Sequence, residues 1–242
     1  MHDERKQERE ATPDVPRPDW EDEARRPGSV PPAGQDDEPD EDEPPREPAP
    51  PVEESRMIEK FLKARTILIS EAITSELAKR VYQNLILLES EDAEKPITLI
   101  INSPGGEADT GFGIYDMIRF VRPPVRCLVA GLCASAAVMV YLAAPKESRL
   151  SLPNSRFLLH QPSSATFGQA SDLEIASREI LKLRDRYNEI VAHETGKKLE
   201  QINEDADRDF WMSAHEAMEY GLVTKVVTRR SELDPVIAGA KP

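Results

Sequence analysis

The apolar stretch VAGLCASAAVMVYLAAP (129–145) contains one serine, Ser135, whose hydroxyl could act as a nucleophile. Strand-like sequence changes into Ala-rich, helix-like sequence close to Ser135, so the hydroxyl would lie at a helix N-terminus. Unpaired backbone N–H groups and the helix dipole favour developing negative charge there. The run GLCASAA differs from the G-x-S-x-G pattern of many hydrolases. Ser135 is therefore a candidate nucleophile, with two alternatives: a small filler in a buried segment, or a polar residue in a membrane span.

A nucleophilic serine needs a base, which is most often histidine. We expect three of the four histidines to be solvated: His2 in a highly charged N-terminal segment, His193 near the end of a long helical pattern, and His215 in the first turn of another. His160 differs because it ends the apolar strand-like run FLLH. Strand ends are where rigid scaffolds present catalytic groups. His160 is the candidate base, and a satisfied core histidine is the alternative.

A carboxylate would complete the set by orienting the imidazole and stabilising its cation. Three aspartates, Asp205, Asp207 and Asp209, lie together in the run EDADRDFW (204–211), in a predicted loop between two helices. Spacing does not choose among them, and a solvated acidic loop is the alternative interpretation.

Backbone donors for an oxyanion could come from the turn SPGG (103–106). Gly105 and Gly106 have no side chain, so the main chain can approach a substrate closely. No metal-binding cluster, Walker loop or dinucleotide fingerprint competes with this site, and we expect neither a metal nor a cofactor. Cys133 and His160 could form a thiol pair, but no sequence feature favours that pair over Ser135.

Strand-like and helix-like patterns alternate from Met57 onward. Strands are predicted at 66–70, 97–102 and 125–131, and each precedes a helical pattern. The first helix follows a predicted N-cap at Thr74. Its apolar face is predicted to comprise Leu77, Val81, Leu85 and Leu88. Repeated βα units of this kind predict an α/β fold with a mainly parallel sheet covered by helices.

The C-terminal half continues with further elements. The run RLSLPNSRFLLHQP (149–162) predicts two strands joined by a turn. Ser171 to Glu174 fits a capping box and predicts the start of a long amphipathic helix that ends at Gly196. A second box, Ser213 to Glu216, predicts a short helix that precedes a last strand, LVTKVV (222–227).

The N-terminal segment has a different composition. Residues 1–55 contain 19 Asp and Glu, 7 Lys and Arg, and 12 of the 21 prolines. Such a segment cannot bury enough apolar surface to offset the entropy of ordering it, so we predict a disordered acidic extension over 1–55. One globular domain is predicted over 56–230, followed by a tail over 231–242. The acidic charge argues against nucleic acid or an anionic membrane as a partner.

The sequence also bears on the cellular compartment. The start MHDERKQERE has no apolar h-region, so we expect no signal peptide. The two cysteines, Cys127 and Cys133, lie in apolar sequence and are predicted to be reduced core thiols of a cytoplasmic protein. The uncharged run 127–144 just reaches the length of a membrane span, but a strand followed by a buried helix explains it equally well.

Several long strings in the sequence resemble one known family, the proteolytic subunits of the Clp protease (ClpP). The strings are INSPGG (101–106), IYDMIRFV (114–121), the Ala-Ser pair before the apolar helix, LPNSRFLLHQP (152–162), GQASDLEIASREIL (168–181) and DRDFWMSAHEAMEYGLV (207–223). They occur in the family's order, and the resemblance extends from about residue 57 to 228.

The resemblance implies a role for individual residues. Ser135 matches the family's nucleophile, His160 its general base, and Asp209 its orienting acid. The oxyanion donors would be the backbone N–H groups of Gly106 and Ala136. Two further residues match the family's charged pair at the contact between rings: Asp207 and Arg208.

The resemblance also implies the architecture and the partners. The fold would be ClpP/crotonase-like, with the helix from Ser171 as a protruding handle. Fourteen copies would form two stacked heptameric rings that enclose the active sites. The substrates would be unfolded polypeptides, bound as a strand beside the segment after Gly106 and the segment 164–168. An AAA+ ATPase of the ClpX, ClpA or ClpC type would feed the chamber.

The chain departs from the family pattern in three places. Ala136 and Ala137 stand where Met-Gly usually follows the nucleophile, and Leu132 and Cys133 replace the usual polar-small pair before it. The family's axial-loop sequence is not recognisable in PPVEESRMIEKFLKAR (50–65). Two other functions stay open at this stage: a non-catalytic ring subunit, and a crotonase-type acyl-CoA enzyme that shares the fold.

Overall fold

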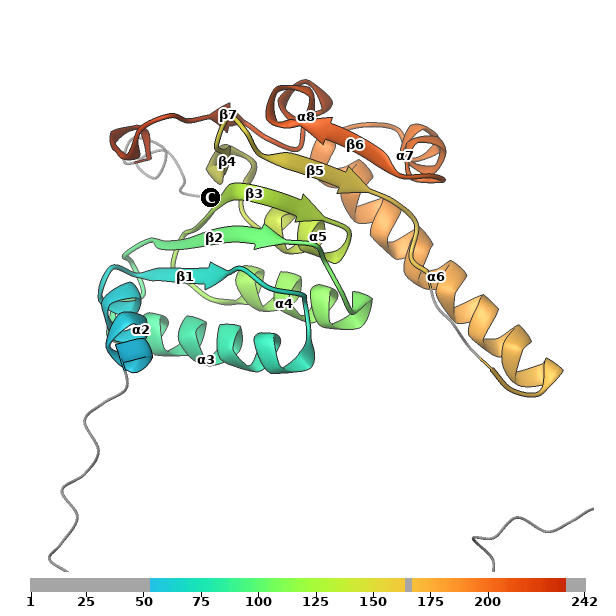
Figure 1. Cartoon of the computed structure of the whole chain (residues 1–242), viewed down its shortest axis with the longest axis horizontal. Helices are drawn as coiled ribbons and strands as arrows, with labels where there is room; N and C mark the ends of the chain where they lie inside the picture. Colours follow the sequence, from blue (N-terminus) through green and yellow to red (C-terminus); the bar gives the residue numbers. More distant parts are fainter. Residues whose placement is uncertain (1–52, 164–166, 234–242) are drawn as a thin grey trace, which may run out of the picture. The chain divides into compact units, whose positions relative to one another are not determined.

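The computed structural model describes residues 53–163 and 167–233 (Figure 1). The predicted acidic extension over 1–55 lies outside this part, apart from its last three residues, which open helix α2 (Glu53–Lys63). The predicted C-terminal tail is described only as far as Leu233.

Within the described residues, seven strands form one sheet in which only β6 runs antiparallel to its neighbour. The order is β1-β2-β3-β4-β7, with β5 beside the end of β3 and β6 beside β5. The bounds are β1 (Thr66–Ile69), β2 (Ile97–Ser103), β3 (Val125–Ala134), β4 (Arg149–Ser151), β5 (Arg156–Leu159), β6 (Phe210–Ser213) and β7 (Lys225–Val226). The predicted α/β fold with a mainly parallel sheet is confirmed.

Helices connect the parallel strands and cover the sheet (Figure 1). Their bounds are α3 (Ser75–Glu91), α4 (Ala108–Phe120), α5 (Ala136–Leu142), α6 (Ala170–Thr195), α7 (Leu199–Asp205), α8 (Ala214–Tyr220) and the short 3₁₀ helices η1 (Lys146–Ser148) and η2 (Arg230–Glu232). Thr74 caps α3 as predicted, because its side chain accepts a hydrogen bond from the Leu77 N–H. The predicted apolar face of α3 is buried.

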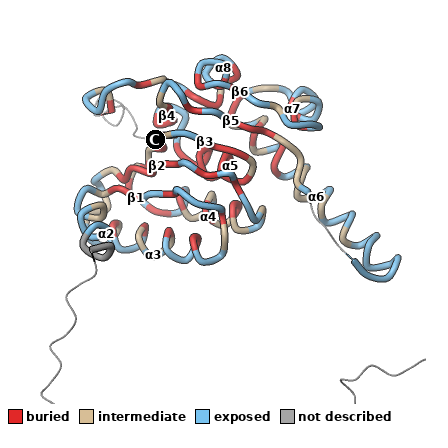
Figure 2. Tube along the Cα trace, viewed as in Figure 1, coloured by how far each residue is buried: buried red, intermediate tan, exposed pale blue. Residues whose placement is uncertain are grey.

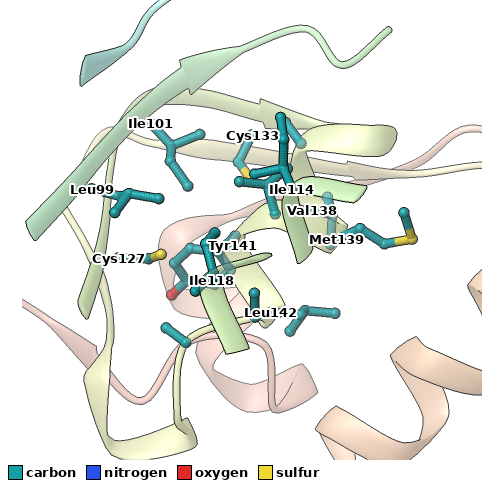
Figure 3. Packing of buried hydrophobic residues seen from close by; sticks show 14 of the residues in the cluster. Leu99, Ile101, Ile114, Ile118, Cys127, Cys133, Val138, Met139, Tyr141 and Leu142 are labelled. Carbon is teal, nitrogen blue, oxygen red and sulfur yellow. The ribbon is translucent and has the colours of Figure 1, made fainter. Parts of the chain in front are cut away.

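The apolar stretch around Ser135 divides into the end of β3 and the short helix α5. All seven residues of α5 are buried. Figure 3 shows four of their side chains, Val138, Met139, Tyr141 and Leu142, among labelled residues of β2, β3 and α4. In the part of the chain that the structure describes, no helix combines the length and apolar character needed to cross a bilayer. Cys127 and Cys133 are both free and buried, as predicted for core thiols.

Two successive parts of strand β3 pair with two different strands. Cys127–Val129 pair with β4, whereas Leu132–Ala134 pair with β5. Between them, Gly131 has φ +116°, and a Cβ there would lie 2.6 Å from Asn102 Oδ1. The same Asn102 oxygen accepts a hydrogen bond from the Leu132 N–H at 2.9 Å. This glycine irregularity redirects the end of β3 toward β5.

Helix α6 extends away from the sheet, and most of its length is exposed (Figures 1 and 2). Its buried residues lie in the C-terminal third: Tyr187, Asn188, Val191 and Thr195. The predicted capping box at Ser171 is wrong, because α6 already begins at Ala170 with Gln169 as N-cap. Ser171 therefore lies inside the first turn. Gly196 ends the helix with φ 78°, as predicted.

The run EDADRDFW, predicted as a loop between helices, ends in a strand, β6. Phe210–Ser213 pair antiparallel with β5 instead. The second predicted capping box, between Ser213 and Glu216, is present and opens α8. The last predicted strand, LVTKVV, is shortened to the two residues of β7.

A buried ion pair joins α5, β4 and α6. The Arg149 side chain is 1% exposed, and it donates to the carbonyls of Leu142 and Ala144 at the end of α5, at 2.9 and 2.8 Å. It also donates to the Glu194 backbone at 3.0 Å and pairs with the Glu194 carboxylate. Tyr115 donates to the same carboxylate at 3.1 Å. The guanidinium thus satisfies carbonyls at the end of α5 and ties them to α6.

Arg149→Met is expected to destabilise the fold strongly, because it leaves the Glu194 carboxylate buried without its main partner. Removing one member of a buried pair typically costs ~3–5 kcal/mol. The urea midpoint, measured at one fixed protein concentration, should fall far more than in the control Arg122→Met, whose ion pair with Glu89 has an Arg122 side chain that is 74% exposed. Equal shifts in the two variants would contradict this account.

The stabilisation by this pair should also depend on pH. Burial alone would raise the pKa of Glu194, but the hydrogen bond and charge of Arg149 outweigh burial and hold that pKa below its ordinary value of 4.5. Because the folded-state pKa is lowered, the contribution is complete above pH 4.5 and is lost as the pH falls through the folded-state pKa. Urea midpoints should therefore converge between wild type and Arg149→Met at acid pH.

Candidate active site

The candidate nucleophile occupies a strained turn between β3 and α5. Ser135 has φ 56° and ψ −126°, a conformation that is uncommon for a residue with a side chain and costs on the order of 1–3 kcal/mol. Its N–H donates to the Leu158 carbonyl at 3.0 Å. Its own carbonyl accepts from the Val138 N–H at 2.9 Å and from the Tyr187 hydroxyl at 3.3 Å. Contacts from β5, α5 and α6 therefore hold this turn.

The SPGG turn packs directly against the Ser135 turn. Gly105 has φ +89°, and a Cβ there would lie 2.5 Å from the Ala134 carbonyl oxygen and 2.7 Å from Ser135 Cβ. Gly106 has φ +155°, and a Cβ there would lie 2.3 Å from the Ile73 carbonyl oxygen. No side chain fits at either position. The close approach brings two predicted oxyanion donors, the N–H groups of Gly106 and Ala136, to the wall of one cleft.

The geometry suits oxyanion binding at Ala136 for a simple reason. Ala136 is the first residue of α5, so its N–H has no carbonyl acceptor within the helix. Such free donors at a helix start favour an oxygen that carries developing negative charge.

Strand register places the candidate base beside one aspartate. Leu159 of β5 lies opposite Phe210 of β6, so His160 and Asp209 form the next position of this antiparallel pair. His160 Nδ1 lies 3.3 Å from Asp209 Oδ1. This contact leaves Nε2 as the ring nitrogen available for proton transfer. The His160 and Asp209 side chains are 29% and 64% exposed.

The other two aspartates of EDADRDFW have different partners. Asp205 Oδ2 accepts from the Tyr220 hydroxyl at 2.6 Å. The backbone carbonyl of Asp207 accepts from Gln161 at 2.9 Å. Asp207 and Arg208 are both exposed in the loop between α7 and β6. The three aspartates therefore have different partners in the structure, and only Asp209 contacts His160. Their spacing in the sequence does not reveal this difference.

A cleft of about 580 Å³ contains Ser135 and His160. Its remaining wall is mixed. Apolar side chains from α4, α5 and α6 line one part, and Glu107, Asp109 and Thr110 line another. Within the described residues, the Ser135 hydroxyl makes no direct hydrogen bond to His160 within 3.5 Å. Hydrogen bonds between a nucleophile and its base are often long outside the substrate complex.

The thiol alternative is excluded by burial. Cys133 is fully buried, and burial raises the pKa of its thiol well above the ordinary range. Burial likewise raises the pKa of Cys127 to about 12. Neither thiol can supply a thiolate near neutral pH. As predicted, His193 and His215 are exposed, whereas His2 lies outside the described residues.

Tyr187 lies within the long amphipathic helix that the sequence predicts, and no motif marks it as a site residue. The structure places it in the cleft wall and in contact with the Ser135 carbonyl. The available signal was its residue type, because a tyrosine on an apolar helix face buries a ring and brings a hydroxyl that needs a partner.

Comparison with known proteins identifies the family. A family model described as Clp protease matches residues 52–230, which is most of the chain. The chain belongs to the Clp protease family. The ATP-dependent Clp protease proteolytic subunit 3 of Rhizobium etli is 47% identical over 171 residues, covering 71% of this chain and 88% of that protein. The proteolytic subunit 2 of Treponema pallidum is 45% identical over 180 residues, covering 74% and 90%.

A solved structure supports the same conclusion. A point mutant of ClpP1 from Listeria monocytogenes matches with a TM-score of 0.68 and 44% identity, covering 73% of this chain and 99% of that one. The expected ClpP/crotonase-like fold is confirmed. The chain is a proteolytic subunit of the Clp protease family and therefore a serine-type endopeptidase.

Gly105→Ala is expected to lower the rate of peptide hydrolysis at least ~100-fold, because the added methyl group would displace the Ser135 turn and with it an oxyanion donor. Peptidase assays and circular dichroism of the folded protein test this expectation. The matched control is Gly196→Ala, which imposes a similar φ of +78° but has nothing within 4 Å of the added Cβ. Gly196→Ala should lose some stability and keep its activity. Full activity in Gly105→Ala would contradict the close approach described above.

Proposed function

We propose that Ser135, His160 and Asp209 form the catalytic triad with which this endopeptidase hydrolyses peptide bonds of unfolded proteins. The observation that supports the triad most strongly is the 3.3 Å contact between His160 and Asp209, next to a cleft that also contains Ser135. The family, the strained turn at Ser135 and the free helix-start N–H at Ala136 support the same assignment.

The mechanism follows from these positions. His160 Nε2 removes the proton of the Ser135 hydroxyl as its oxygen attacks the scissile carbonyl. Asp209 orients the ring through Nδ1 and stabilises the imidazolium that forms. The N–H groups of Gly106 and Ala136 stabilise the oxyanion of the tetrahedral intermediate. His160 then protonates the leaving amine. In the second half of the reaction His160 removes a proton from water, whose oxygen attacks the acyl carbon. The bond to Ser135 Oγ breaks, His160 returns the proton to that oxygen, and the carboxylic acid product leaves.

An extended peptide is the proposed form of the bound substrate. It would add as a strand beside the segment after Gly106, so that main-chain hydrogen bonds give affinity with little demand on sequence. The second predicted docking segment, 164–168, falls partly on residues 164–166, which lie outside the described part. The apolar part of the cleft wall, which includes Phe112 and Met139, would accept an apolar substrate side chain next to the scissile bond.

Ala136 is the departure from the family pattern that bears most directly on this cleft. It is buried and close to Gly111, where an added Cβ would lie 3.1 Å from Ala136 Cβ. A methyl group in place of the usual Met side chain leaves the backbone donor unchanged and enlarges the space beside the nucleophile. We propose that the change alters substrate preference and preserves activity.

Asp209→Asn should lower kcat for a short fluorogenic peptide by ~10⁴-fold, because an amide no longer fixes the productive tautomer of His160. Ser135→Ala should abolish turnover and labelling by a fluorophosphonate probe. The matched control is Asp205→Asn, whose side-chain oxygen can still accept from Tyr220 and which should keep near wild-type activity.

Peptide hydrolysis, probe labelling and an added assay of acyl-CoA turnover distinguish the alternative functions. Equal hydrolysis by wild type and Ser135→Ala would contradict the triad. A wild-type chain that fails to react with the probe would instead support a non-catalytic ring subunit. Turnover of acyl-CoA that survives Ser135→Ala would support a crotonase-type enzyme.

Two stacked heptameric rings are the proposed assembly. The protruding part of α6 carries exposed apolar side chains, which a contact between rings would bury: Leu173, Ile175 and Leu181. Asp207 and Arg208 would form the accompanying charged contact. The active sites would then face a closed chamber, and an AAA+ ATPase of the ClpX, ClpA or ClpC type would supply unfolded chains to it. We place this assembly in the cytoplasm, in keeping with its two free core thiols.

Ile175→Asp is expected to convert an assembly with the mass of fourteen chains into one of seven, because a buried carboxylate would disfavour the contact between rings. Light scattering coupled to gel filtration measures this mass. The matched control is Ile86→Asp on α3, because Ile86 and Ile175 are both 54% exposed. Fourteen chains in both variants would contradict the proposed role of α6.

A further inference from the structure

The carbonyl of Ser135 and the N–H of Ala136 belong to one planar peptide unit. Any group that fixes the carbonyl end therefore fixes the direction of the N–H at the other end. Because that N–H is a proposed oxyanion donor, its direction affects the rate of the reaction. Donors act best when they already point to the position that the oxyanion will occupy.

The corresponding peptide unit of the other proposed donor is fixed by the main chain. The Gly105 carbonyl accepts from the Ile73 N–H at 2.8 Å, and the Gly106 N–H is the other end of that unit. The next residue, Glu107, donates its N–H to the Ile73 carbonyl at 2.9 Å. Backbone bonds to Ile73 on both sides thus hold the Gly106 donor. The one side-chain hydrogen bond to this turn within the described residues, from the Gly105 N–H to the Ser103 hydroxyl at 3.2 Å, belongs to the preceding peptide unit.

The Ser135–Ala136 unit is held differently. Its carbonyl oxygen accepts from the Val138 N–H at 2.9 Å within the first turn of α5 and from the Tyr187 hydroxyl at 3.3 Å. Tyr187 comes from α6, lies against the cleft and is 7% exposed. The second hydrogen bond of this carbonyl therefore depends on one side chain from a different helix.

We propose that Tyr187 is a positioning residue for the oxyanion hole, acting through the Ser135–Ala136 peptide unit. The proposal rests on the triad and oxyanion donors proposed above. The Tyr187 hydroxyl restrains a turn whose backbone is strained, so the unit keeps the orientation that directs the Ala136 N–H into the cleft. A carbonyl that accepts a hydrogen bond also polarises its peptide unit, which strengthens the N–H as a donor.

The chemistry of Tyr187 fits this role. Burial raises the pKa of its hydroxyl, so the group stays protonated and able to donate throughout the working pH range. Packing alone would require only the ring, which phenylalanine supplies equally well. The hydroxyl is therefore the part of the side chain whose removal tests the proposal.

The experiment compares Tyr187→Phe with the matched control Tyr141→Phe. Tyr141 is also buried, and its hydroxyl donates to the Leu150 carbonyl at the same distance of 3.3 Å. Both variants lose one hydrogen bond from a buried tyrosine to a backbone carbonyl, but only Tyr187 contacts the proposed oxyanion-hole peptide. The readouts are kcat and KM for a fluorogenic peptide, and the inhibition constant of a peptide boronate whose tetrahedral adduct places an oxygen in the oxyanion hole.

Tyr187→Phe should lower kcat by about tenfold and leave KM nearly unchanged, a smaller loss than the ~100-fold or more expected when an oxyanion donor is removed outright. Boronate affinity should fall by the same factor as kcat, because both report binding of the oxyanion. Tyr141→Phe should change neither quantity, although its melting temperature falls. Tyr187→Met, which fills the space without a hydroxyl, should repeat the defect and replaces the Phe variant if that variant does not assemble.

Wild-type kcat and boronate affinity in Tyr187→Phe would overturn the proposal, and so would equal losses in Tyr187→Phe and Tyr141→Phe. Either result leaves the triad itself intact as long as Ser135→Ala is inactive. Failure of the proposed function is a separate outcome, because it appears as hydrolysis by Ser135→Ala.

Discussion

The site depends on the close contact between two turns, the glycine turn after β2 and the Ser135 turn after β3. β2 and β3 are adjacent parallel strands, so their carboxyl ends lie at the same edge of the sheet. Gly105 lies so near the Ser135 turn that an added Cβ would be 2.7 Å from Ser135 Cβ. The contact leaves no room for a side chain at Gly105. It also brings together the proposed oxyanion donors of two segments that are 30 residues apart in the sequence, Gly106 and Ala136.

The rest of the fold holds this contact in place. The fully buried helix α5 follows the Ser135 turn directly and fixes its position. At the other end of that helix, Arg149 donates hydrogen bonds to the backbone carbonyls of Leu142 and Ala144. The redirected end of β3 pairs with β5, which carries His160, and β6 adds Asp209 from the other side. Helix α6 contributes the Tyr187 hydroxyl to the same turn. Each proposed catalytic group is thus supported by a different element, and the Tyr187 hydroxyl bonds α6 to the carbonyl of the proposed nucleophile.

Sequence patterns predicted the parallel βα units, the cap at Thr74 and the change from strand to helix at Ser135. In these elements the local propensity of the residues and their apolar periodicity indicate the same secondary structure. They did not choose Asp209 from its neighbours, since that choice depends on the register of β6 against β5, a long-range pairing. The predicted cap at Ser171 failed because the helix begins one residue earlier. Tyr187 was missed as a site residue because only the folded chain brings α6 to the Ser135 carbonyl.

The Ser135 turn and the glycine turn are proposed to form one preorganised oxyanion site, and a crystal structure of the protein with a peptide boronate would show whether they do. Boron should be bonded to Ser135 Oγ, with one boronate oxygen ~2.7–3.1 Å from both the Gly106 and Ala136 nitrogens and with Ser135 still near its present φ of 56°. A boronate oxygen that points away from both nitrogens, or a Ser135 turn that has rearranged to bind it, would rule out a preorganised site.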